Sequence, residues 1–347
     1  MFFYAIRGAI TVDMNTPQQI LEASKILLER IVGDNEILKE DIVSIIFTAT
    51  KDLDTQYPAV AVRQLGMVDV PLFCCQEMYV GGSLERCIRV LIHIQSSDFK
   101  KIHHVYMREA ICLRPDLILD FHSEVINIAV DGPAGAGKST IAKVISEKLN
   151  IMYLDTGAMY RAIAYKMLGE EIGLKNISEV VSLLESTDIQ IKHEGTEQRI
   201  IVNNEDVTPF IRTSEISEAA SRVATIPEVR LKLVEIQRQI AKNSSLVMDG
   251  RDIGTYVLPN APLKFYITAS LDERANRRWE EYKQNGIFEN IEQIKGDIEK
   301  RDANDEGRDF APLKQSEDAI VIDTTDKTIQ QVSREIFKHI SNYIDKS

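Results

Sequence analysis

The chain has 347 residues, which is more than one hydrophobic core commonly supports and therefore indicates two domains. Hydrophobic residues make up 44% and charged residues 27%, and no apolar run reaches the roughly 18 residues of a membrane span, which excludes an integral membrane protein. The formal net charge of −12 argues against general nucleic-acid binding, so any anionic ligand must be held by local arginine clusters. The first ten residues, MFFYAIRGAI, lack the features of a signal peptide, and the expected compartment is the cytoplasm.

The first part of the chain predicts a strand-rich α+β domain over residues 1–120. A strand is expected at 2–12, followed by an amphipathic helix at 15–32 that Asn15 or Thr16 can cap, with Pro17 in its first turn. A short helix should end at Gly66. Further strands are expected at 41–50, 70–75, 86–94 and 104–113. In 86–94 apolar residues alternate with others that include Arg89, so one face packs on a core and the other carries an arginine.

The second part of the chain, residues 125–347, follows a short joint at 121–124. The joint is not rich in glycine or serine, so limited independent motion is expected. Beyond it strand and helix patterns alternate, which predicts a parallel sheet covered by helices. The clearest elements are a strand at 125–131, a helix at 138–149 and strands at 245–250 and 263–269. A hairpin-like insert is expected within about 178–210.

The sequence GPAGAGKS at 132–139 fits the phosphate-binding pattern G-x-x-x-x-G-K-S between an apolar strand and a helix. Its glycines let backbone N–H groups turn inward around phosphates, and the helix N-terminus adds a positive dipole. Lys138 is expected to reach the β- and γ-phosphates of ATP, and Ser139 to ligate Mg²⁺. The predicted ATP site comprises Gly132, Pro133, Ala134, Gly135, Ala136, Gly137, Lys138, Ser139 and Thr140. GTPases, motor ATPases and small-molecule kinases all share this loop.

The segment LDTGAMYR at 154–161 resembles the acceptor side of bacterial cytidylate kinases. Similar segments recur at 211–230, 249–255, 273–278, 300–308 and 322–329. The resemblance covers residues 125–347 and implies an α/β nucleoside monophosphate kinase that uses ATP and Mg²⁺ to phosphorylate CMP or dCMP. It also implies a lid at about 270–310 and an insert that lies over the acceptor nucleotide, favouring CMP and dCMP over UMP.

The acceptor phosphate is anionic, and planar arginine side chains can grip it bidentately. The resemblance assigns this task to Arg161, Arg251 and Arg301. It implies that the cytosine edge is read by Ser221, Arg230 and Asp252, and that the ribose is bound by Asp305 with Arg308 nearby. Thr156 stands at the acceptor site where some relatives have serine. The remaining implied residues are Arg274, Arg277 and Arg278 on the closing lid, of which Arg277 and Arg278 are expected to act in catalysis with Lys138, and Asp249 near Mg²⁺.

The first part of the chain has no metal spacing, glycine loop or Ser-His-Asp order, but it carries arginines at strand positions. Such arginines suit either a multiply anionic ligand or salt bridges on a polar sheet face. Four segments, AIRGAITV, YPAVAVRQL, CQEMYVGGSLERCIRVL and HVYMREAICLRPDL, resemble the strand-rich chorismate mutases of the Bacillus type. The resemblance covers residues 1–120 and implies a homotrimer, a pseudo-α/β barrel, with active sites between subunits and no cofactor.

The rearrangement of chorismate to prephenate needs positioning and fixed hydrogen-bond donors rather than proton transfer. The resemblance implies that Arg89 donates to the ether oxygen and to a carboxylate, that Arg7 binds the enolpyruvyl carboxylate, and that Tyr106 donates to a carboxylate. Glu77 and the Cys74 region would meet the ring hydroxyl. The other implied pocket residues are Arg63, Arg114, Tyr57 and Leu113. Two residues depart from the family pattern: Val60 replaces a frequent lysine and Phe73 a small hydroxyl residue, and both bear on substrate affinity.

Three functional hypotheses remain at this point. In the first, both parts are active enzymes that use chorismate, CMP or dCMP, and ATP as small-molecule substrates. In the second, the first part is a ligand-binding or trimerising module whose catalysis has lapsed. In the third, which the acceptor arginines and the acidic charge disfavour, the phosphate-binding loop belongs to a regulator acting on a protein or on RNA. The cysteines, Cys74, Cys75, Cys87 and Cys112, fit no zinc spacing and are expected to be reduced thiols.

Overall fold

The computed structural model describes residues 1–114, 116, 117, 125–173, 176–194, 197–284, 286 and 288–344. The chain divides into two compact units, one formed by Met1–Phe121 with Arg334–Ser347 and the other by His122–Ser333. The joint expected at 121–124 lies outside the described residues. Within the described residues, no helix combines the length and the hydropathy needed to cross a membrane.

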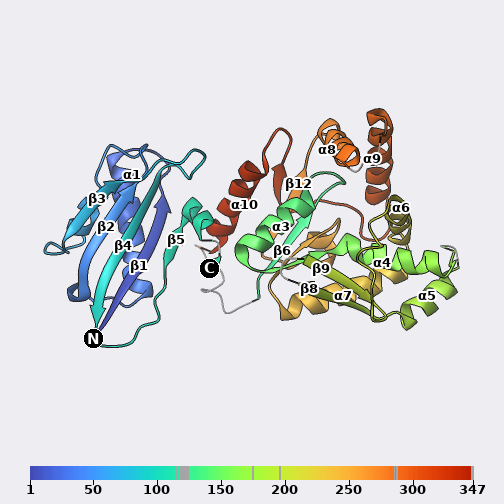
Figure 1. Cartoon of the computed structure of the whole chain (residues 1–347), viewed down its shortest axis with the longest axis horizontal. Helices are drawn as coiled ribbons and strands as arrows, with labels where there is room; N and C mark the ends of the chain where they lie inside the picture. Colours follow the sequence, from blue (N-terminus) through green and yellow to red (C-terminus); the bar gives the residue numbers. More distant parts are fainter. Residues whose placement is uncertain are drawn as a thin grey trace. The chain divides into compact units, whose positions relative to one another are not determined.

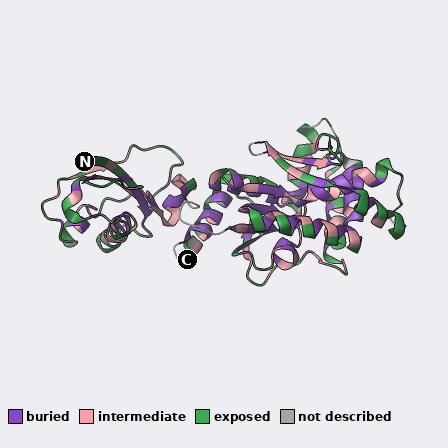
Figure 2. Ribbon diagram, turned by 90° about the horizontal axis from the view of Figure 1, so that it is seen from below, coloured by how far each residue is buried: buried purple, intermediate pink, exposed green. Residues whose placement is uncertain are grey.

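The N-terminal unit is a five-stranded mixed sheet with the order β3-β2-β4-β1-β5 and helices α1 and α2 on one face (Figure 1). The bounds of its elements are β1 Phe2–Thr11, α1 Pro17–Asp34, β2 Ile42–Ala49, α2 Val60–Gln64, β3 Leu72–Gln76, β4 Cys87–Ser96 and β5 Val105–Met107. Its core lies between the sheet and α1, and the purple stretches of Figure 2 mark it.

Local signals in the sequence explain these elements. Thr16, rather than Asn15, caps α1, since its hydroxyl accepts from the backbone N–H of Gln19. Gly66 adopts a φ of +81° just after α2, as expected for the glycine that follows a helix. Along β4, Ile88, Val90, Ile92 and Ile94 are buried, and Arg89 lies on the opposite face and is half-buried. The alternation predicted for this strand is therefore confirmed.

The strand predicted at 104–113 was wrong beyond Met107. The chain pairs with β1 only at Val105–Met107 and then forms a 3-10 helix, Arg108–Leu113. The reason lies in β1, whose last residue is Thr11 and which offers no further ladder. Instead, the Thr11 hydroxyl accepts from Glu109 N–H at 3.1 Å, and its carbonyl accepts from the Arg108 guanidinium at 2.9 Å. These bonds satisfy the backbone at the strand end and turn the chain.

The second unit contains a five-stranded sheet with the order β13-β12-β6-β11-β7, and every pairing in it is parallel, as predicted. The strands are β6 Asn127–Asp131, β7 Met152–Asp155, β11 Leu246–Asp249, β12 Leu263–Thr268 and β13 Ile320–Asp323. The helices that follow are α3 Lys138–Leu149, α4 Thr156–Gly169, α5 Ile177–Ser186, α6 Ser214–Val223, α7 Pro227–Asn243, α8 Leu271–Gln284 and α9 Ile291–Glu306. Of these, α3 and α4 pack directly on the sheet. The last helix, α10 Ile329–Ile344, falls mostly in the first unit. Because parallel strands end at the same edge, the residues after β6, β7 and β11 meet there.

The insert is a small antiparallel sheet, which confirms the predicted hairpin. It consists of β8 Ile189–Glu194, β9 Glu197–Val202 and β10 Glu205–Asp206. Helix α5 occupies the first part of the range expected for the insert. The lid range contains the helix pair α8 and α9, which share a small core around Ala275, Ile294 and Ile298.

Candidate active sites

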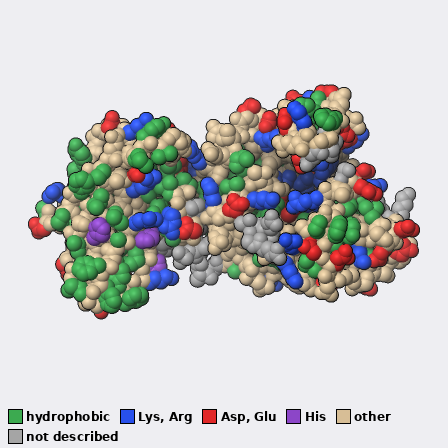
Figure 3. All heavy atoms as spheres, in the orientation of Figure 1, with side chains coloured by type: hydrophobic (Ala, Val, Ile, Leu, Met, Phe, Trp, Pro, Cys, Tyr) green, Lys and Arg blue, Asp and Glu red, His purple; other side chains and the backbone are tan. Residues whose placement is uncertain are grey.

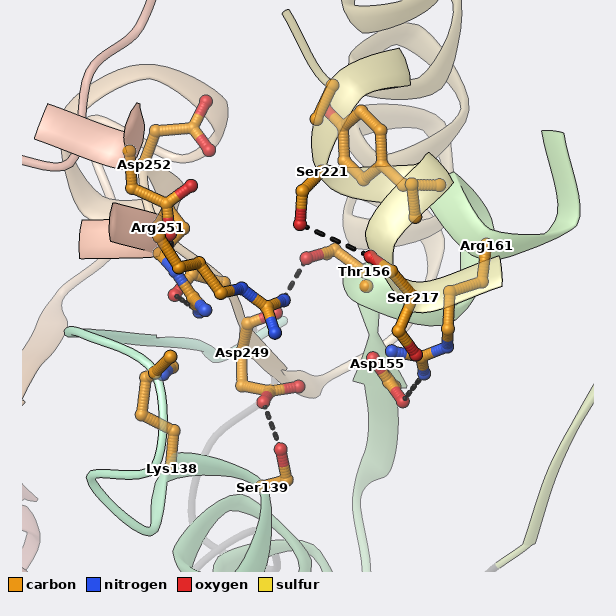
Figure 4. Close-up of a pocket in the computed structure, with 18 of the residues that line it drawn as sticks. Lys138, Ser139, Asp155, Thr156, Arg161, Ser217, Ser221, Asp249, Arg251 and Asp252 are labelled. Carbon is orange, nitrogen blue, oxygen red and sulfur yellow. Dashed lines mark hydrogen bonds and ion pairs between the residues drawn. The ribbon is translucent and has the colours of Figure 1, made fainter. Parts of the chain in front are cut away.

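A cavity of about 250 Å³ lies at the carboxyl edge of the parallel sheet in the second unit. The phosphate-binding loop, α4, α6, α7, the residues after β11 and the lid helices all contribute to its wall. Figure 4 shows Lys138 and Ser139 on one side of it, Arg251 and Asp252 on another, and Thr156, Arg161 and Ser221 opposite them. The sequence-predicted residues from six separate segments therefore converge on one space.

The phosphate-binding loop has the geometry that its glycines permit. Gly132, Gly135 and Gly137 have φ values of +142°, +76° and +90°, which only glycine adopts without strain. A Cβ at Gly132 would also overlap the backbone carbonyl of Ile267. Lys138 is 6% exposed, and its Nζ donates to the Pro133 carbonyl at 2.6 Å across the loop. Burial and the nearby Arg251 hold the pKa of Lys138 well below its ordinary value, which favours an anionic partner.

Asp249 joins the loop to the neighbouring strand. Its carboxylate accepts from the Ser139 hydroxyl at 2.7 Å and from the Tyr153 hydroxyl at 3.0 Å. Burial, followed by the charge of Asp155, raises the pKa of Asp249 to about 6. A nearby cation would stabilise the charged form of this buried carboxylate. One hydroxyl beside one carboxylate is a ligand set that suits Mg²⁺ when phosphate and water supply the other ligands.

Three arginines of the predicted acceptor site form ion pairs with two carboxylates, Asp305 and Asp155. Arg251 donates to Asp305 at 2.7 Å, and Arg308 forms an ion pair with the same carboxylate. Arg161 pairs with Asp155 at 2.8 Å. These pairs leave part of each arginine free, because the buried Nε atoms of Arg161 and Arg308 have no hydrogen-bond partner within the described residues.

Arg301 differs from the other arginines of the cavity because no hydrogen bond or ion pair joins it to any described residue. Burial, followed by the positive charge of Arg251, lowers the pKa of Arg301 to about 10. Both causes disfavour the guanidinium cation, and the charge of Asp305 opposes them only in part. The cavity therefore holds a surplus of positive charge that an anionic ligand would neutralise, and Figure 3 shows Lys and Arg side chains gathered in a hollow of this unit.

The residues predicted to read cytosine line the far end of the same cavity. Arg230 is 1% exposed and forms an ion pair with Asp252, and its Nε has no partner within the described residues. Ser221 lies on α6 and donates to the Ser217 carbonyl at 3.2 Å. The Thr156 hydroxyl donates to the Asp249 carbonyl at 2.7 Å, which ties the start of α4 to the end of β11. An arginine, a carboxylate and a hydroxyl are thus presented together.

Only one of the three lid arginines faces the cavity. Arg278 lines it together with Arg301. Arg274 pairs with Asp302 and donates to the Ala134 carbonyl at 3.1 Å. Arg277 donates to Glu273 at 2.8 Å and to the Thr324 carbonyl at 2.8 Å. The structure therefore places Arg274 and Arg277 against the outside of the phosphate-binding loop.

Three cavity residues with polar side chains were not singled out from the sequence. Asp155 caps α4 by accepting from Ala158 N–H at 2.9 Å, and it also holds Arg161. Tyr160 and Ser217 line the wall near Arg230 and Ser221. Asp155 could have been found, since it precedes the helix in the quoted segment LDTGAMYR, where an aspartate is a common cap. Ser217 had no comparable signal.

The insert lines a different pocket. Within the described residues, no part of β8–β10 contributes to the cavity, whereas Gln198, Arg199 and Ile200 line a second pocket against α3. The insert nevertheless contacts the acceptor side, because the side chain of Gln198 bonds to the backbone of Asp155. Gln198 accepts from Asp155 N–H at 2.7 Å and donates to the Asp155 carbonyl at 3.3 Å.

In the N-terminal unit, the predicted residues Arg7, Arg89 and Tyr106 lie on the sheet face opposite α1. Thr48, Arg89, Ala9 and Tyr106 form a row across four strands, because Arg89 pairs with Thr48 and Ala9, and Ala9 pairs with Tyr106. Paired residues on neighbouring strands point to the same face. Arg89 forms an ion pair with Glu77, whose other carboxylate oxygen accepts from the Thr48 hydroxyl at 2.5 Å. Arg7 lies two residues before Ala9 and so shares this face.

The remaining mutase residues lie toward the two edges of this sheet. Arg114, after β5, is held by Asp116 at 2.7 Å, and Leu113 packs with Tyr106 around Ala110. At the other edge Phe73 and Tyr57 are exposed. Cys74 packs toward the core and lines a pocket with Tyr57, on the face opposite Arg89, whereas the pairing of Cys75 with Thr48 puts Cys75 on the face of Arg89. Arg63 and Val60 lie on α2. One chain thus does not enclose all these residues in a single pocket.

Comparison with known proteins gives two matches that divide the chain. The family model "Cytidylate kinase" matches residues 128–342, and the model "Chorismate mutase type I" matches residues 3–117. A cytidylate kinase from Caldicellulosiruptor bescii is 50% identical over 213 residues, which is 61% of this chain and 94% of that protein. One from Halalkalibacterium halodurans is 46% identical over 219 residues, or 63% and 99% of the two chains. A solved chorismate mutase from Clostridium thermocellum is 47% identical, covering 30% of this chain and 94% of its own, with a TM-score of 0.29.

Proposed function

The chain belongs to the cytidylate kinase family and carries a chorismate mutase domain ahead of the kinase. We propose that the cavity of the second unit binds CMP and ATP, and that the polar face of the N-terminal sheet binds chorismate. The kinase part transfers the γ-phosphoryl group of ATP to CMP or dCMP, giving ADP and the diphosphate. The mutase part rearranges chorismate to prephenate. Both reactions use small anionic metabolites, which fits a bifunctional enzyme of the cytoplasm.

The acceptor nucleotide binds in the cavity at the sheet edge. Arg301, Arg251 and Arg161 hold its phosphate, and the cationic surplus around Arg301 supports this role because an anion relieves it. Asp252, Arg230 and Ser221 read the N4 amine, N3 and O2 of cytosine, since together they offer an acceptor and donors. Asp305 accepts from the ribose hydroxyls, with Arg308 beside it, and the Thr156 hydroxyl completes the acceptor side.

ATP binds at the loop of residues 132–140. Its backbone N–H groups and Lys138 hold the β- and γ-phosphates. The anionic phosphates raise the lowered pKa of the buried lysine back toward its ordinary value. Ser139 and Asp249 would hold Mg²⁺, which supplies charge neutralisation on the phosphates. Closure of the lid would bring Arg278 onto the transferring phosphoryl group and exclude water, while Arg277 remains behind the phosphate-binding loop.

One observation carries the kinase assignment: Arg301, which has no hydrogen bond or ion pair from its side chain to any described residue, lines the same cavity as Lys138. The test is ADP release by the full chain with ATP, Mg²⁺ and each of CMP, dCMP, UMP and AMP. We expect the fastest turnover with CMP and dCMP. Absence of ADP release with every acceptor would reject the assignment.

In the mutase part, Arg89 donates to the breaking ether bond and Arg7 to a carboxylate of chorismate. Tyr106 donates to a carboxylate, and Glu77 accepts from the ring hydroxyl while it orients Arg89. The register of the sheet supports this arrangement, because Arg89 on β4 and Tyr106 on β5 both pair with Ala9 on β1 and therefore lie on the same face. No proton transfer or cofactor is required.

The mutase site is completed by a second copy of the chain in a homotrimer. Exposed apolar residues support this proposal: Phe73 is 62% and Tyr57 71% exposed, and they share an edge with Met78 and Tyr79. Sedimentation of the full chain should give a trimer, and a monomer at assay concentration would contradict it. Prephenate formation by the same sample tests catalysis; no acceleration that depends on Arg89 would leave only a lapsed binding module.

A further inference from the structure

Asp131 is a buried carboxylate that the proposed reaction does not use. It is the last residue of β6, directly before Gly132 of the phosphate-binding loop, and is 5% exposed. A negative charge beside a polyphosphate site is unfavourable by itself. Both oxygens are nevertheless engaged: Oδ1 accepts from Ile253 N–H at 2.8 Å, and Oδ2 accepts from Gly254 N–H at 2.7 Å. The side chain therefore holds backbone that lies 122 residues further along the chain.

The backbone that Asp131 holds is the turn after β11. Ile253 and Gly254 begin a short π-helix, Ile253–Val257, and the first N–H groups of a helix have no partner inside it. Asp252 precedes this turn, and its carbonyl accepts from Tyr256 N–H at 2.9 Å and Val257 N–H at 3.0 Å. The direction of the Arg251 and Asp252 side chains consequently depends on how the turn is fixed.

Gly254 makes this contact possible. A Cβ at this position would lie 3.3 Å from Asp131 Oδ2 and 3.1 Å from Lys264 Cδ. Lys264 packs against the same glycine, and its Nζ donates to the Pro259 carbonyl at 2.6 Å and to Asp318 at 2.7 Å. Two buried side chains, one from β6 and one from β12, thus pack closely on the turn at Gly254.

We propose that Asp131 is a positioning residue for acceptor recognition: it fixes the turn that aims Arg251 and Asp252 into the cavity, and so links the ATP loop to the CMP side of the site. The inference rests on the proposed acceptor role of that cavity. Because Asp131 does not line the cavity, its effect passes through Arg251 and Asp252, which do.

The test is Asp131→Asn in the full chain, with steady-state kinetics for each substrate. An asparagine keeps one acceptor oxygen and turns an amide group toward the second N–H. Loss of that bond should raise the KM for CMP about tenfold and change the KM for ATP by less than about twofold. Calorimetric CMP binding to the folded protein should weaken to the same extent. Ser146→Ala is the matched control, since it removes another buried hydrogen bond, to the Ile151 carbonyl, outside the cavity.

A second variant covers the case in which Asp131→Asn does not fold. Gly254→Ala would place a methyl group against the Asp131 carboxylate and should also raise the KM for CMP while leaving the KM for ATP nearly unchanged. Equal rises in both KM values that follow the loss of thermal stability, as for Ser146→Ala, would overturn the inference. If the wild type phosphorylates CMP and the variants have the same KM for CMP as the wild type, the inference is overturned as well. A wild type that phosphorylates no nucleotide would overturn the proposed function together with this inference.

Discussion

At the scale of single residues, the two sites contrast in how their arginines are paired. Arg89 has a carboxylate partner in Glu77, so its cost of burial is offset before any ligand arrives. Arg301 has no ion pair within the described residues, and the charge of Asp305 offsets its burial only in part, which leaves a role for an anionic ligand. The kinase site is therefore prepared for a strong anion, and substitutions at Arg301 and at an exposed arginine should differ sharply.

Arg301→Gln should raise the KM for CMP by about tenfold to a hundredfold, because a charge-assisted, bidentate contact with phosphate is lost. The protein should become no less stable, since the unpaired cation is removed. Steady-state kinetics and thermal unfolding, followed by Trp279 in this unit, measure the two effects. Arg222→Gln is the control: it lies on α6, is exposed and pairs only with Glu218. A KM for CMP that matches this control would show that Arg301 does not bind the acceptor.

His104 gives a pH dependence to the mutase part. Its Nδ1 accepts the Arg7 N–H at 3.2 Å, and burial, followed by the charges of Arg7 and Arg114, lowers its pKa below the ordinary 6.5. The folded state thus binds fewer protons than the unfolded one, so this contribution to stability is full above pH 6.5 and is lost as pH falls through the lowered pKa. Hydrogen exchange at the Arg7 amide, corrected for intrinsic rates, should lose protection as the pH falls below 6.5 toward the lowered pKa of His104.

His104→Gln should remove that pH dependence, since an amide oxygen can accept the N–H without titrating. His93→Gln, on β4 and hydrogen-bonded to Ser44 at 3.0 Å, should leave it in place. If protection at Arg7 falls equally in the His104 variant, another group controls the strand edge.

The sequence predicted the residues whose chemistry is unusual for their place, such as arginines on strands and the glycines of the phosphate-binding loop. It did not reveal Asp131, which directly precedes the loop GPAGAGKS. Its role depends on the backbone of Ile253 and Gly254, and only the register of β6 against β11 brings these segments together. Cys74 shows a related limit, since which face it occupies depends on the pairing of β3 with β2.

At the scale of elements, periodicity predicted the strands and helices that bury one face, as in α1 and β4. It failed at 104–113, where the chain pairs with β1 only as far as Met107 and where Arg108 and Glu109 interrupt the alternation of apolar and polar residues. The insert shows another limit. Its hairpin was evident from the sequence, whereas its contact with β7 depends on Gln198 and His193, which pair across the hairpin and both reach the backbone of β7.

Gln198→Ala should therefore weaken acceptor binding without touching the nucleotide. The amide of Gln198 holds the backbone of Asp155, which caps α4 and orients Arg161. We expect the KM for CMP to rise roughly three- to tenfold, in line with one or two lost hydrogen bonds, while the KM for ATP stays unchanged. Gln190→Ala tests the hairpin itself, because Gln190 bonds only to Asp188 nearby. Equal effects of the two variants would assign the loss to the stability of the insert.

At the scale of the whole molecule, each site is built from residues of its own unit. The kinase cavity draws only on residues 134–308, and the mutase residues all lie before residue 115. The mutase needs no nucleotide, and neither proposed product is a substrate of the other reaction. Fusion in one chain therefore does not by itself require that the two activities depend on one another.

Single substitutions in the full chain should separate the activities. Arg89→Gln should lower prephenate formation by roughly 10³-fold or more, because the donor to the developing charge on the ether oxygen is lost. The same sample should phosphorylate CMP at the wild-type rate, and Arg301→Gln should show the converse pattern. Arg30→Gln, an exposed residue of α1 paired with Asp34, should change neither rate. If loss of Arg89 slows CMP phosphorylation while the trimer stays intact, the two sites are energetically coupled, and the differential contacts that carry this coupling must be sought in both units.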